Sequence, residues 1–506
     1  MSGMASLTLG ELLAGFARTP VPWAGRPVEG LAADSRTVHP GDVFFAVRGG
    51  QRHGLEFLES VRSAGVLAVL WEPPWDGALP ADDTLLLLAI PELRQKLGWI
   101  ASRFYGEPSR RLPVIGITGT DGKTSCAHFL AQALSDAGTG PCGILGTLGN
   151  GVHGQTTPSL YTTPDTLAVQ RWLAGLVADS RRYAVMEVSS HALDQGRVNG
   201  VDFAVAVLTQ LSRDHLDYHG TLDAYAAAKR RLFVDHRPGW AVLNGDDSFG
   251  RQLMKETRMR SGIIVYGLHE RPTLPERWIW SEHLELTMNG VRMQIRSSWG
   301  NGELQAGLLG RFNASNLLAA LAVLLALDMP FDEALMRLAR TETVPGRMER
   351  LGGEAGQPLV VIDYAHTPHA LEQVLRALRE HGRRNRLWCV FGCGGDRDPG
   401  KRPLMGAVAE RFADRVIVTD DNPRTENAKC IVEDILAGMQ HPQAITVIHD
   451  RRAAILGALA KAEADDIVLI AGKGHEDYQI IGVERLPFSD QTVAREFLFS
   501  TEREVA

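Results

Sequence analysis

Cysteine is scarce in this sequence of 506 residues. The chain contains five cysteines, an odd number, and none of them has the paired spacing of a zinc site. Few, unpaired cysteines are typical of a protein whose thiols stay reduced, and they exclude a small disulfide-stabilised secreted scaffold. Cys389 and Cys393 flank the end of an apolar segment, so we expect both side chains to pack in a core.

The sequence also lacks long apolar runs and a surplus of positive charge. No apolar run reaches the about 18 residues that a membrane-spanning helix needs, and the first residues show no basic-then-apolar signal segment. The formal net charge is −7, with acidic and basic residues interspersed, which argues against a nucleic-acid-binding protein. We therefore expect a soluble cytoplasmic protein that acts on small molecules, without a membrane or nucleic-acid partner.

The length of the chain predicts about three domains, at roughly 150 residues per domain. Residues 1–92 mix short strands with helices. Residues 93–343 alternate apolar strands with helical segments, which indicates a mainly parallel sheet between helices, and residues 344–506 repeat this alternation in a doubly wound pattern. Residues 278–308 instead alternate with period two around Asn289-Gly290, which predicts an antiparallel hairpin. The fold class is α/β, and the strands expected in the second and third domains are 183–188, 203–208, 241–244, 263–266, 359–363, 387–391, 416–419, 445–448 and 467–471.

The segment Val114–Thr124 is the most informative motif of the chain. A short apolar strand runs into a turn with glycines at positions 116, 119 and 122, and the turn ends in Lys123-Thr124. Glycine lets backbone N–H groups wrap around phosphate oxygens, and a helix that begins near Lys123 directs the positive end of its dipole at them. Lys123 supplies a charge, and Thr124 a hydroxyl for Mg²⁺. An ordinary strand-to-helix turn would explain one of these glycines, but not three followed by Lys-Thr.

Two further segments that follow apolar strands carry titratable side chains. Glu187 lies near the carboxyl end of the strand expected at 183–188, where a parallel sheet presents functional residues, and is a candidate Mg²⁺ ligand. The segment Leu208–His219 is rich in Asp and His, and His215 is our candidate metal ligand there, although both residue types are common in loops without a function. Residues 225–231 predict a helix on which Lys229, by pattern alone, is one more solvated lysine.

Taken in order along the chain, these motifs resemble the Mur ligases of peptidoglycan synthesis, and the match spans essentially the whole sequence. The resemblance implies a central P-loop domain with a parallel sheet, flanked by an N-terminal α/β substrate domain and a C-terminal Rossmann-like domain that binds an amino acid. The matching motifs are the loop at 116–124, Glu187–His191, Arg213–His219, Ala226–Lys229, Asn313–Asn316, Pro345–Glu349, Asp363–Pro368 and, for one subgroup of the family, Ala33–Arg36, Asp421–Arg424 and Gly472–Glu476.

The resemblance implies an ATP-dependent ligase that phosphorylates a substrate carboxylate, after which an amine displaces the phosphate. In this family the lysine that matches Lys229 is carboxylated by CO₂ and binds a metal ion. For Arg347 the alternative role is a linker salt bridge, and for Asp363 and His366 it is capping after a strand. The implied catalytic residues are Lys123, Glu187, His215 and Lys229; the implied Mg²⁺ ligands are Thr124, Glu187, His215 and carboxylated Lys229; and the implied ATP-binding residues are Gly119, Thr120, Asp121, Gly122, Lys123, Thr124, Asn316, Arg347, Asp363 and His366.

The matching subgroup acts on UDP-N-acetylmuramoyl-L-alanyl-D-glutamate and meso-2,6-diaminopimelate, and we expect a monomer. Arg424 could bind the distal carboxylate of diaminopimelate, which lysine lacks, although a surface charge at a helix start is the alternative. Gly49–Arg52 could also be merely a turn. The residues implied for the nucleotide dipeptide are Ser35, Arg36, Gly50, Gln51, Arg52, Thr162, Thr163, Ser189, Gln195 and Arg197, and those for the amino acid are Arg397, Asp421, Asn422, Pro423, Arg424, Gly472 and Glu476.

Two positions depart from the family pattern. Gln210 stands where Asn is usual, and Asp121 stands where Asn is commoner. Asp121 places a carboxylate beside the expected phosphates, which is unfavourable unless the side chain points outward or reaches Mg²⁺.

Three other functions stay open at this point. A folylpolyglutamate synthetase shares the loop but lacks Asp34–Arg36 and Asp421–Arg424. A non-catalytic protein that only binds UDP-muramoyl peptides would be expected to have lost at least one of four residues, all of which are present: Lys123, Glu187, His215 and Lys229. A generic P-loop kinase would not explain the motifs in residues 344–506.

Overall fold

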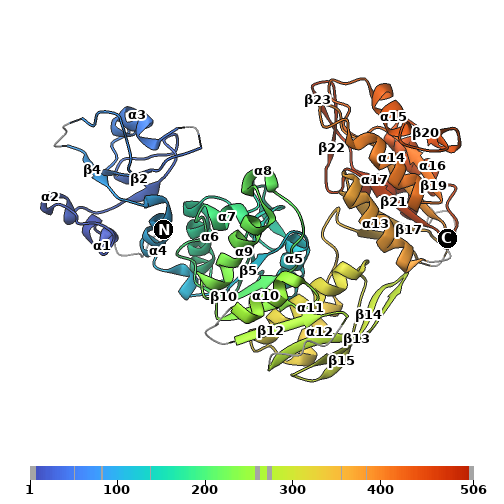
Figure 1. Cartoon of the computed structure of the whole chain (residues 1–506), viewed down its shortest axis with the longest axis horizontal. Coiled ribbons are helices and arrows are strands. Elements are labelled where there is room, and N and C mark those ends of the chain that lie inside the picture. The colour runs from blue at the N-terminus through green and yellow to red at the C-terminus, as the bar shows by residue number, and fades with distance from the viewer. Residues whose placement is uncertain are drawn as a thin grey trace. The chain divides into compact units, whose positions relative to one another are not determined.

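The computed structural model describes residues 7–50, 52–80, 84–136, 138, 140–256, 262–269, 276–354, 356–382 and 385–500. These residues form two compact units (Figure 1). The first contains the chain up to Tyr266 together with Ala322–Asp328, and the second contains Ile279–Leu321 and the chain from Met329 onward. Within the described ranges, no helix is both long enough and apolar enough to cross a membrane.

The N-terminal sheet has four parallel strands in the order β1-β2-β3-β4. Along β2, Val43 and Phe45 enter one apolar cluster, while Phe44 and Ala46 enter another. Both faces of the sheet are therefore buried, as a parallel sheet requires. The elements of this part are α1 (Leu9–Leu13), α2 (Val21–Ala24), β1 (Gly30–Ala32), β2 (Asp42–Ala46), η1 (Gly54–Phe57), α3 (Leu58–Ser63), β3 (Ala68–Trp71), β4 (Leu86–Ala89) and α4 (Leu93–Phe104).

The sheet of the first unit that carries the phosphate loop has the order β12-β11-β10-β5-β9-β6-β7-β8. Neighbouring strands from β12 to β6 are parallel, and β7 and β8 add an antiparallel edge. The four strands expected here are confirmed, whereas β6, β7 and β8 were not predicted. The elements are η2 (Pro108–Arg110), β5 (Val114–Thr118), α5 (Lys123–Leu134), β6 (Gly143–Gly146), β7 (Gly149–Val152), β8 (Gln155–Thr157), α6 (Thr166–Ala178), β9 (Ala184–Glu187), α7 (Ser190–Asp194), β10 (Phe203–Leu208), α8 (Leu216–His219), α9 (Leu222–Val234), β11 (Trp240–Asn244), α10 (Ser248–Glu256) and β12 (Gly262–Gly267).

The expected antiparallel hairpin is confirmed in the second unit. Thr287 of β13 (Arg277–Thr287) pairs with Gly290 of β14 (Gly290–Ser297), so the chain turns at Asn289-Gly290 as predicted. A third strand, β15 (Asn301–Ala306), pairs antiparallel with β14. The helices α11 (Arg311–Ala326) and α12 (Phe331–Ala339) follow.

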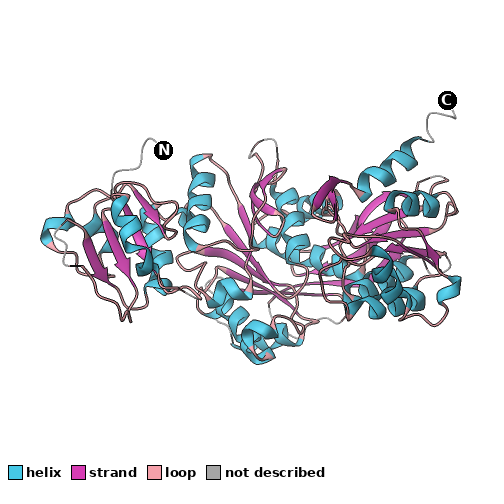
Figure 2. Ribbon diagram, turned by 90° about the horizontal axis from the view of Figure 1, so that it is seen from above, coloured by secondary structure: helices cyan, strands magenta, loops and turns pink. Residues whose placement is uncertain are grey.

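The C-terminal sheet has the order β16-β17-β21-β18-β19-β20, and only the edge pair β16-β17 is antiparallel. Helices flank its strands (Figure 2). All five expected strands are confirmed, and Cys389 and Cys393 are buried as expected. Strand β16 and the hairpin β22-β23 were not predicted. The elements are β16 (Glu349–Gly352), β17 (Leu359–Asp363), α13 (Pro368–His381), β18 (Leu387–Phe391), α14 (Lys401–Phe412), β19 (Arg415–Val418), α15 (Ala428–Leu436), η3 (Pro442–Ala444), β20 (Thr446–Val447), α16 (Arg451–Leu459), β21 (Ile467–Ala471), β22 (Tyr478–Ile481), β23 (Glu484–Pro487) and α17 (Asp490–Ser500).

Candidate functional site

The predicted phosphate loop joins β5 to α5. β5 lies between β10 and β9, and α5 begins at Lys123. Gly119 and Gly122 have φ angles of 151° and 83°, which L-residues with side chains rarely adopt. A Cβ atom on Gly119 would also lie 1.8 Å from Thr209 Oγ1, so only glycine fits at this position. The prediction of a glycine-dependent turn that leads into a helix is confirmed.

The chain that follows β10 holds this loop in place. The Thr209 N–H donates to Thr118 O at 3.0 Å, and the Thr209 hydroxyl donates to Asp121 O at 2.6 Å. The Thr120 N–H in turn donates to Gln210 O at 2.8 Å. These bonds fix the loop from a neighbouring strand, so its shape does not depend on its own sequence alone. Thr209 was missed in the sequence, where a hydroxyl after a strand carries no particular signal.

Lys123 and Lys229 converge on one carbonyl oxygen of the loop. The Nζ atoms of Lys123 and Lys229 donate to Gly119 O at 3.0 Å and 2.7 Å. Lys229 is only 1% exposed, so the interpretation of a solvated lysine is wrong. Burial, and then the charge of Lys123, lower the pKa of Lys229 well below its usual value. The sequence pattern predicts that Lys229 lies on a helix, but it does not show that the helix face with Lys229 contacts the phosphate loop.

Glu187 ends β9 and faces the first turn of α5. Its Oε2 accepts the hydroxyl of Thr124 at 3.0 Å, and its Oε1 accepts the N–H of Thr147 at 2.8 Å. The side chain is buried, and this burial raises the pKa of Glu187, although the charge of Lys123 and the hydrogen bonds from Thr147 and Thr124 oppose the shift. Thr147 follows β6 and was not predicted. The structure thus brings together two of the implied Mg²⁺ ligands, Thr124 and Glu187.

His215 and Lys229 both lie close to the ring of Tyr225. The ring centres of His215 and Tyr225 are 6.0 Å apart, and Lys229 Nζ lies 4.5 Å from the centre of the Tyr225 ring. On its other side, His215 stacks edge-on against His191 at 4.9 Å. Nowhere in the described part of the chain do three or more His, Cys, Asp or Glu side chains gather as a metal site. The oxygens of Thr124 and Glu187 nevertheless fit Mg²⁺, which prefers oxygen ligands and is commonly held by one or two carboxylates with substrate phosphates.

The residues implied for the muramoyl peptide form one connected cluster beside Glu187. Arg197 donates from NH1 to Thr163 O at 2.8 Å and from NH2 to Gln195 Oε1 at 2.7 Å. The Thr163 hydroxyl donates to Glu187 O at 2.8 Å and accepts the N–H of Ser189 at 3.1 Å. Thr162 joins the cluster, because its hydroxyl lies 3.1 Å from that of Thr147.

The residues implied for the uridine diphosphate follow two adjacent strands of the N-terminal sheet. Ser35 and Arg36 come after β1, whereas Gly50 and Arg52 come after β2, so both segments leave the same carboxyl edge. Arg36 is exposed and forms an ion pair with Asp34, with 2.6 Å between Arg36 NH2 and Asp34 Oδ2. Gln51 lies outside the described residues.

Arg347, Asp363 and His366 lie together in the second unit. The carboxylate of Asp363 accepts two backbone N–H groups at 2.8 Å, from Met348 and from Ala365. Asp363 therefore caps the chain after β17, as its alternative interpretation supposes, and burial raises its pKa to about 6. The guanidinium of Arg347 lies 5.4 Å from the centre of the Tyr364 ring, and its buried Nε has no hydrogen-bond partner among the described residues. His366 Nδ1 is 2.8 Å from Tyr364 O.

Asn316 is buried on α11, and its Nδ2 is 3.4 Å from Asn313 Oδ1. This contact lies within one helix and does not test its implied role toward ATP.

The residues implied for the amino acid gather around the segment after β19. Arg424 has a φ of 52°, which is uncommon for a residue with a side chain, and its NH1 donates to Gly395 O at 2.7 Å. Arg397 is exposed, and both arginines lie close enough to Asp396 to help lower the pKa of that carboxyl, after hydrogen bonds from Thr425. The described structure thus places Arg397 and Arg424 at one locus.

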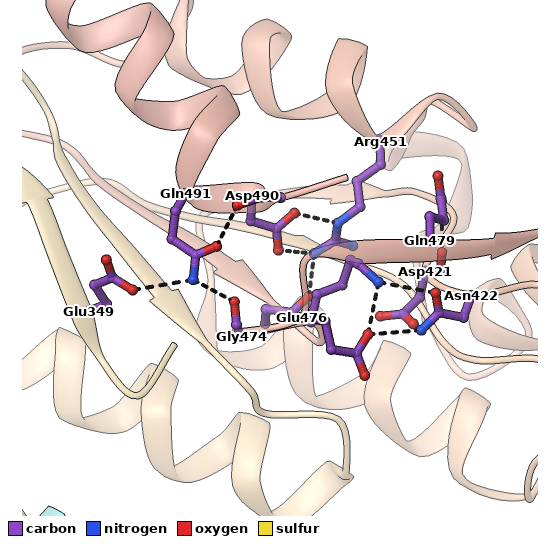
Figure 3. Close-up of polar contacts among 12 residues, drawn as sticks. Glu349, Asp421, Asn422, Arg451, Gly474, Glu476, Gln479, Asp490 and Gln491 are labelled. Carbon is purple, nitrogen blue, oxygen red and sulfur yellow. Dashed lines mark hydrogen bonds and ion pairs between the residues drawn. The ribbon is translucent and has the colours of Figure 1, made fainter. Parts of the chain in front are cut away.

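Gly472 and Glu476 follow β21, and Glu476 lies beside Asp421 and Asn422 (Figure 3). A Cβ atom on Gly472 would lie 2.6 Å from Asp421 Oδ2, and Asn422 Nδ2 donates to Glu476 Oε2 at 3.0 Å. Lys473 lies between them within the motif Gly472–Glu476, and the sequence predicted no role for it. Its Nζ lies 2.9 Å from Glu476 Oε2.

The two positions that depart from the family pattern contact each other. Gln210 Nε2 donates to Asp121 Oδ2 at 2.7 Å. The carboxylate of Asp121 is exposed, so the amide of Gln210 is the group that fixes its direction next to the phosphate loop. The longer side chain of Gln210 and the charge of Asp121 therefore form a matched pair.

We expect Gln210→Ala to weaken the binding of ATP with Mg²⁺ by about three- to tenfold, because it frees a carboxylate beside the phosphates. In an Asp121→Asn background the same substitution should have little effect, since the negative charge is gone. Titration calorimetry on the four variants measures this coupling. An equal loss of affinity in both backgrounds would contradict the pairing.

Three segments of the chain match domain families of the Mur ligases. Residues 27–105 match "Mur ligase family, catalytic domain", residues 117–324 match "Mur ligase middle domain", and residues 346–474 match "Mur ligase, glutamate ligase domain". The matches follow the chain order of the three parts described above.

Individual relatives are similar over nearly their whole length. The chain is 48% identical over 480 residues to the UDP-N-acetylmuramoyl-L-alanyl-D-glutamate--2,6-diaminopimelate ligase of Chromobacterium violaceum, covering 94% of this chain and 95% of that protein. It is 49% identical over 472 residues to the protein of the same name from Pseudomonas aeruginosa, covering 93% and 95%. A solved structure of a ligase with this name aligns with a TM-score of 0.78 and 36% identity, covering 98% of this chain and 100% of that chain. The chain therefore belongs to the Mur ligase family.

Proposed function

We propose that this chain is the ligase that adds meso-2,6-diaminopimelate to UDP-N-acetylmuramoyl-L-alanyl-D-glutamate in peptidoglycan precursor synthesis, with ATP as the energy source. The observation that carries this proposal is the identity of 48% and 49% to ligases named for these substrates, over more than nine-tenths of each chain. A folylpolyglutamate synthetase or a generic kinase does not account for a match of that extent.

The reaction needs ATP because a carboxylate is a poor electrophile at neutral pH. Phosphorylation of the D-glutamate carboxylate gives an acyl phosphate, and the amine of the incoming amino acid displaces phosphate through a tetrahedral intermediate. No protein nucleophile takes part. The chain contributes positioning and electrostatic stabilisation of negative charge.

We assign the phosphates of ATP to the loop between β5 and α5. The backbone of Gly119, Thr120, Asp121 and Gly122 would surround them, and the ammonium of Lys123, now on Gly119 O, would turn to them. Thr124, Glu187, His215 and carboxylated Lys229 would hold Mg²⁺, which when bound would neutralise charge on the phosphates.

The environment of Lys229 supports its carboxylation. A buried lysine with a lowered pKa is often neutral, and a neutral amine is the form that reacts with CO₂. The lone pair of Nζ forms the N–C bond, and one N–H proton leaves, which gives a carbamate. The carbamate would place a negative charge beside the ammonium of Lys123, since the Nζ atoms of both lysines contact Gly119 O.

The acceptor substrate would lie along the first unit. The cluster of Thr162, Thr163, Ser189, Gln195 and Arg197 offers hydroxyls and a cation for the muramoyl peptide, directly beside Glu187. The edge of the N-terminal sheet with Ser35, Arg36, Gly50, Gln51 and Arg52 would hold the uridine diphosphate.

The second unit would supply further ATP contacts and select the amino acid. Asn316, Arg347, Asp363 and His366 are assigned to ATP. Arg397 and Arg424 are assigned to a carboxylate of diaminopimelate, Glu476 to its distal ammonium, and Asp421, Asn422, Pro423 and Gly472 to the wall of this pocket. We retain the domain boundaries 1–92, 93–343 and 344–506, a cytoplasmic location, where ATP and UDP-linked precursors are available, and a monomeric state as parts of this proposal.

We expect phosphate release to require both the UDP-muramoyl dipeptide and a diamino acid. meso-Diaminopimelate should exceed L-lysine by at least about a hundredfold in kcat/KM, because lysine leaves the guanidinium of Arg424 unpaired. Arg424→Ala should lower the ratio of kcat/KM for meso-diaminopimelate to kcat/KM for L-lysine. A coupled phosphate assay with each amino acid gives the result, and equal turnover of lysine would contradict the assignment.

We expect Lys229→Ala to lower kcat by about a hundredfold or more, and added acetate to restore part of the activity by standing in for the carbamate. The exposed Lys255→Ala variant is the matched control and should respond to neither change. Full activity of Lys229→Ala without acetate would exclude the carbamate.

A further inference from the structure

Lys473 is a buried lysine in the amino-acid pocket that the function described above does not use. Resting on that proposed function, we propose that Lys473 is a positioning residue that fixes the carboxylate of Glu476 and thereby determines recognition of the distal ammonium of the diamino acid. Lys473 follows Gly472 directly after β21, and Glu476 lies three residues later.

The side chain of Lys473 is 0% exposed, so its charge must be compensated by neighbouring groups within the protein. Nζ lies 2.9 Å from Glu476 Oε2 and 3.1 Å from Asn422 Oδ1. It also lies 5.4 Å from the centre of the Tyr478 ring, on β22. Two of its partners, Glu476 and Asn422, are residues assigned to the substrate.

Lys473 also fixes the amide of Asn422. Asn422 Oδ1 accepts from Lys473 and, at 2.9 Å, from the N–H of Ile480, so its Nδ2 must face the other way. That Nδ2 donates to Glu476 Oε2 at 3.0 Å. Both donors therefore bind Oε2, and Oε1, which has no partner among the described residues, is the oxygen that can accept an ammonium from the substrate.

A second buried ion pair, between Arg451 and Asp490, contacts the backbone next to Lys473. Arg451 and Asp490 are both 0% exposed, with 2.7 Å between Arg451 NH2 and Asp490 Oδ2, and Arg451 NH2 also donates to Ala471 O at 3.0 Å. On the other side, Gln491 Nε2 donates to Gly474 O at 2.7 Å. The segment from Ala471 to Gly474 cannot shift easily, so the length of Lys473 sets where its ammonium meets Glu476.

A merely structural role for Lys473 would affect all substrates alike, whereas positioning of Glu476 would affect only recognition of the distal amine. We therefore compare Lys473→Met, which keeps the length but removes the charge and its donors, with the exposed control Lys461→Met. The KM for diaminopimelate should rise about 10- to 100-fold in Lys473→Met, while the KM values for ATP and the UDP-muramoyl dipeptide stay within about twofold. Lys461→Met should behave as wild type.

The decisive comparison uses 2-aminopimelate, which has hydrogen in place of the distal amine. Its KM should be the same in wild type and Lys473→Met, because no ammonium meets Glu476. In a Glu476→Gln background, Lys473→Met should likewise change the KM for diaminopimelate little. Thermal unfolding shows whether Lys473→Met is folded. If it is not, Lys473→Gln, which keeps an N–H donor, takes its place, and the same changes in KM are expected at smaller magnitude.

An unchanged KM for diaminopimelate in a folded Lys473 variant would overturn the inference. So would a rise of equal size for 2-aminopimelate or for ATP. Failure of the underlying function is distinguishable, because wild type would then not turn over diaminopimelate, or would accept 2-aminopimelate with the same KM.

Discussion

The carbonyl oxygen of Gly119 accepts hydrogen bonds from the Nζ atoms of Lys123 and Lys229, and the phosphate loop and helix α9 meet at this contact. It requires a glycine with a φ of 151°, because Thr209 occupies the space of a side chain. It also requires that Lys229 be buried, which costs free energy unless the ammonium loses its proton or gains a partner. The loop, the segment after β10 and the helix α9 are thus joined by hydrogen bonds.

Buried charges also order the amino-acid site proposed in the second unit. Two ion pairs are buried there, Lys473 with Glu476 and Arg451 with Asp490. Each charge can be buried because it has a partner at hydrogen-bond distance. Such pairs contribute little net stability compared with apolar packing, but they hold polar atoms in fixed directions. That is what a site needs when it must distinguish a substrate with a distal amine and carboxylate from one without them.

The sequence predicted those parts of the structure that have local signals. Apolar runs such as Phe203–Leu208 and Leu359–Asp363 became buried strands, and Asn289-Gly290 became a turn. The strands β6–β8 and β22–β23 were missed because they are rich in glycine or lie exposed at an edge, where no alternating pattern is needed. The burial of Lys229 and the contact between Asp121 and Gln210, 89 residues apart, depend on tertiary packing, which no single segment encodes.

In the proposed reaction, ATP activates a substrate carboxylate held beside the loop between β5 and α5. The most direct test labels the D-glutamate carboxylate of the UDP-muramoyl dipeptide with oxygen-18 and follows the label by mass spectrometry after a turnover with diaminopimelate. If an acyl phosphate forms, one labelled oxygen appears in the inorganic phosphate for each amide bond made. Unlabelled phosphate, with amide bond formation intact, would contradict the account.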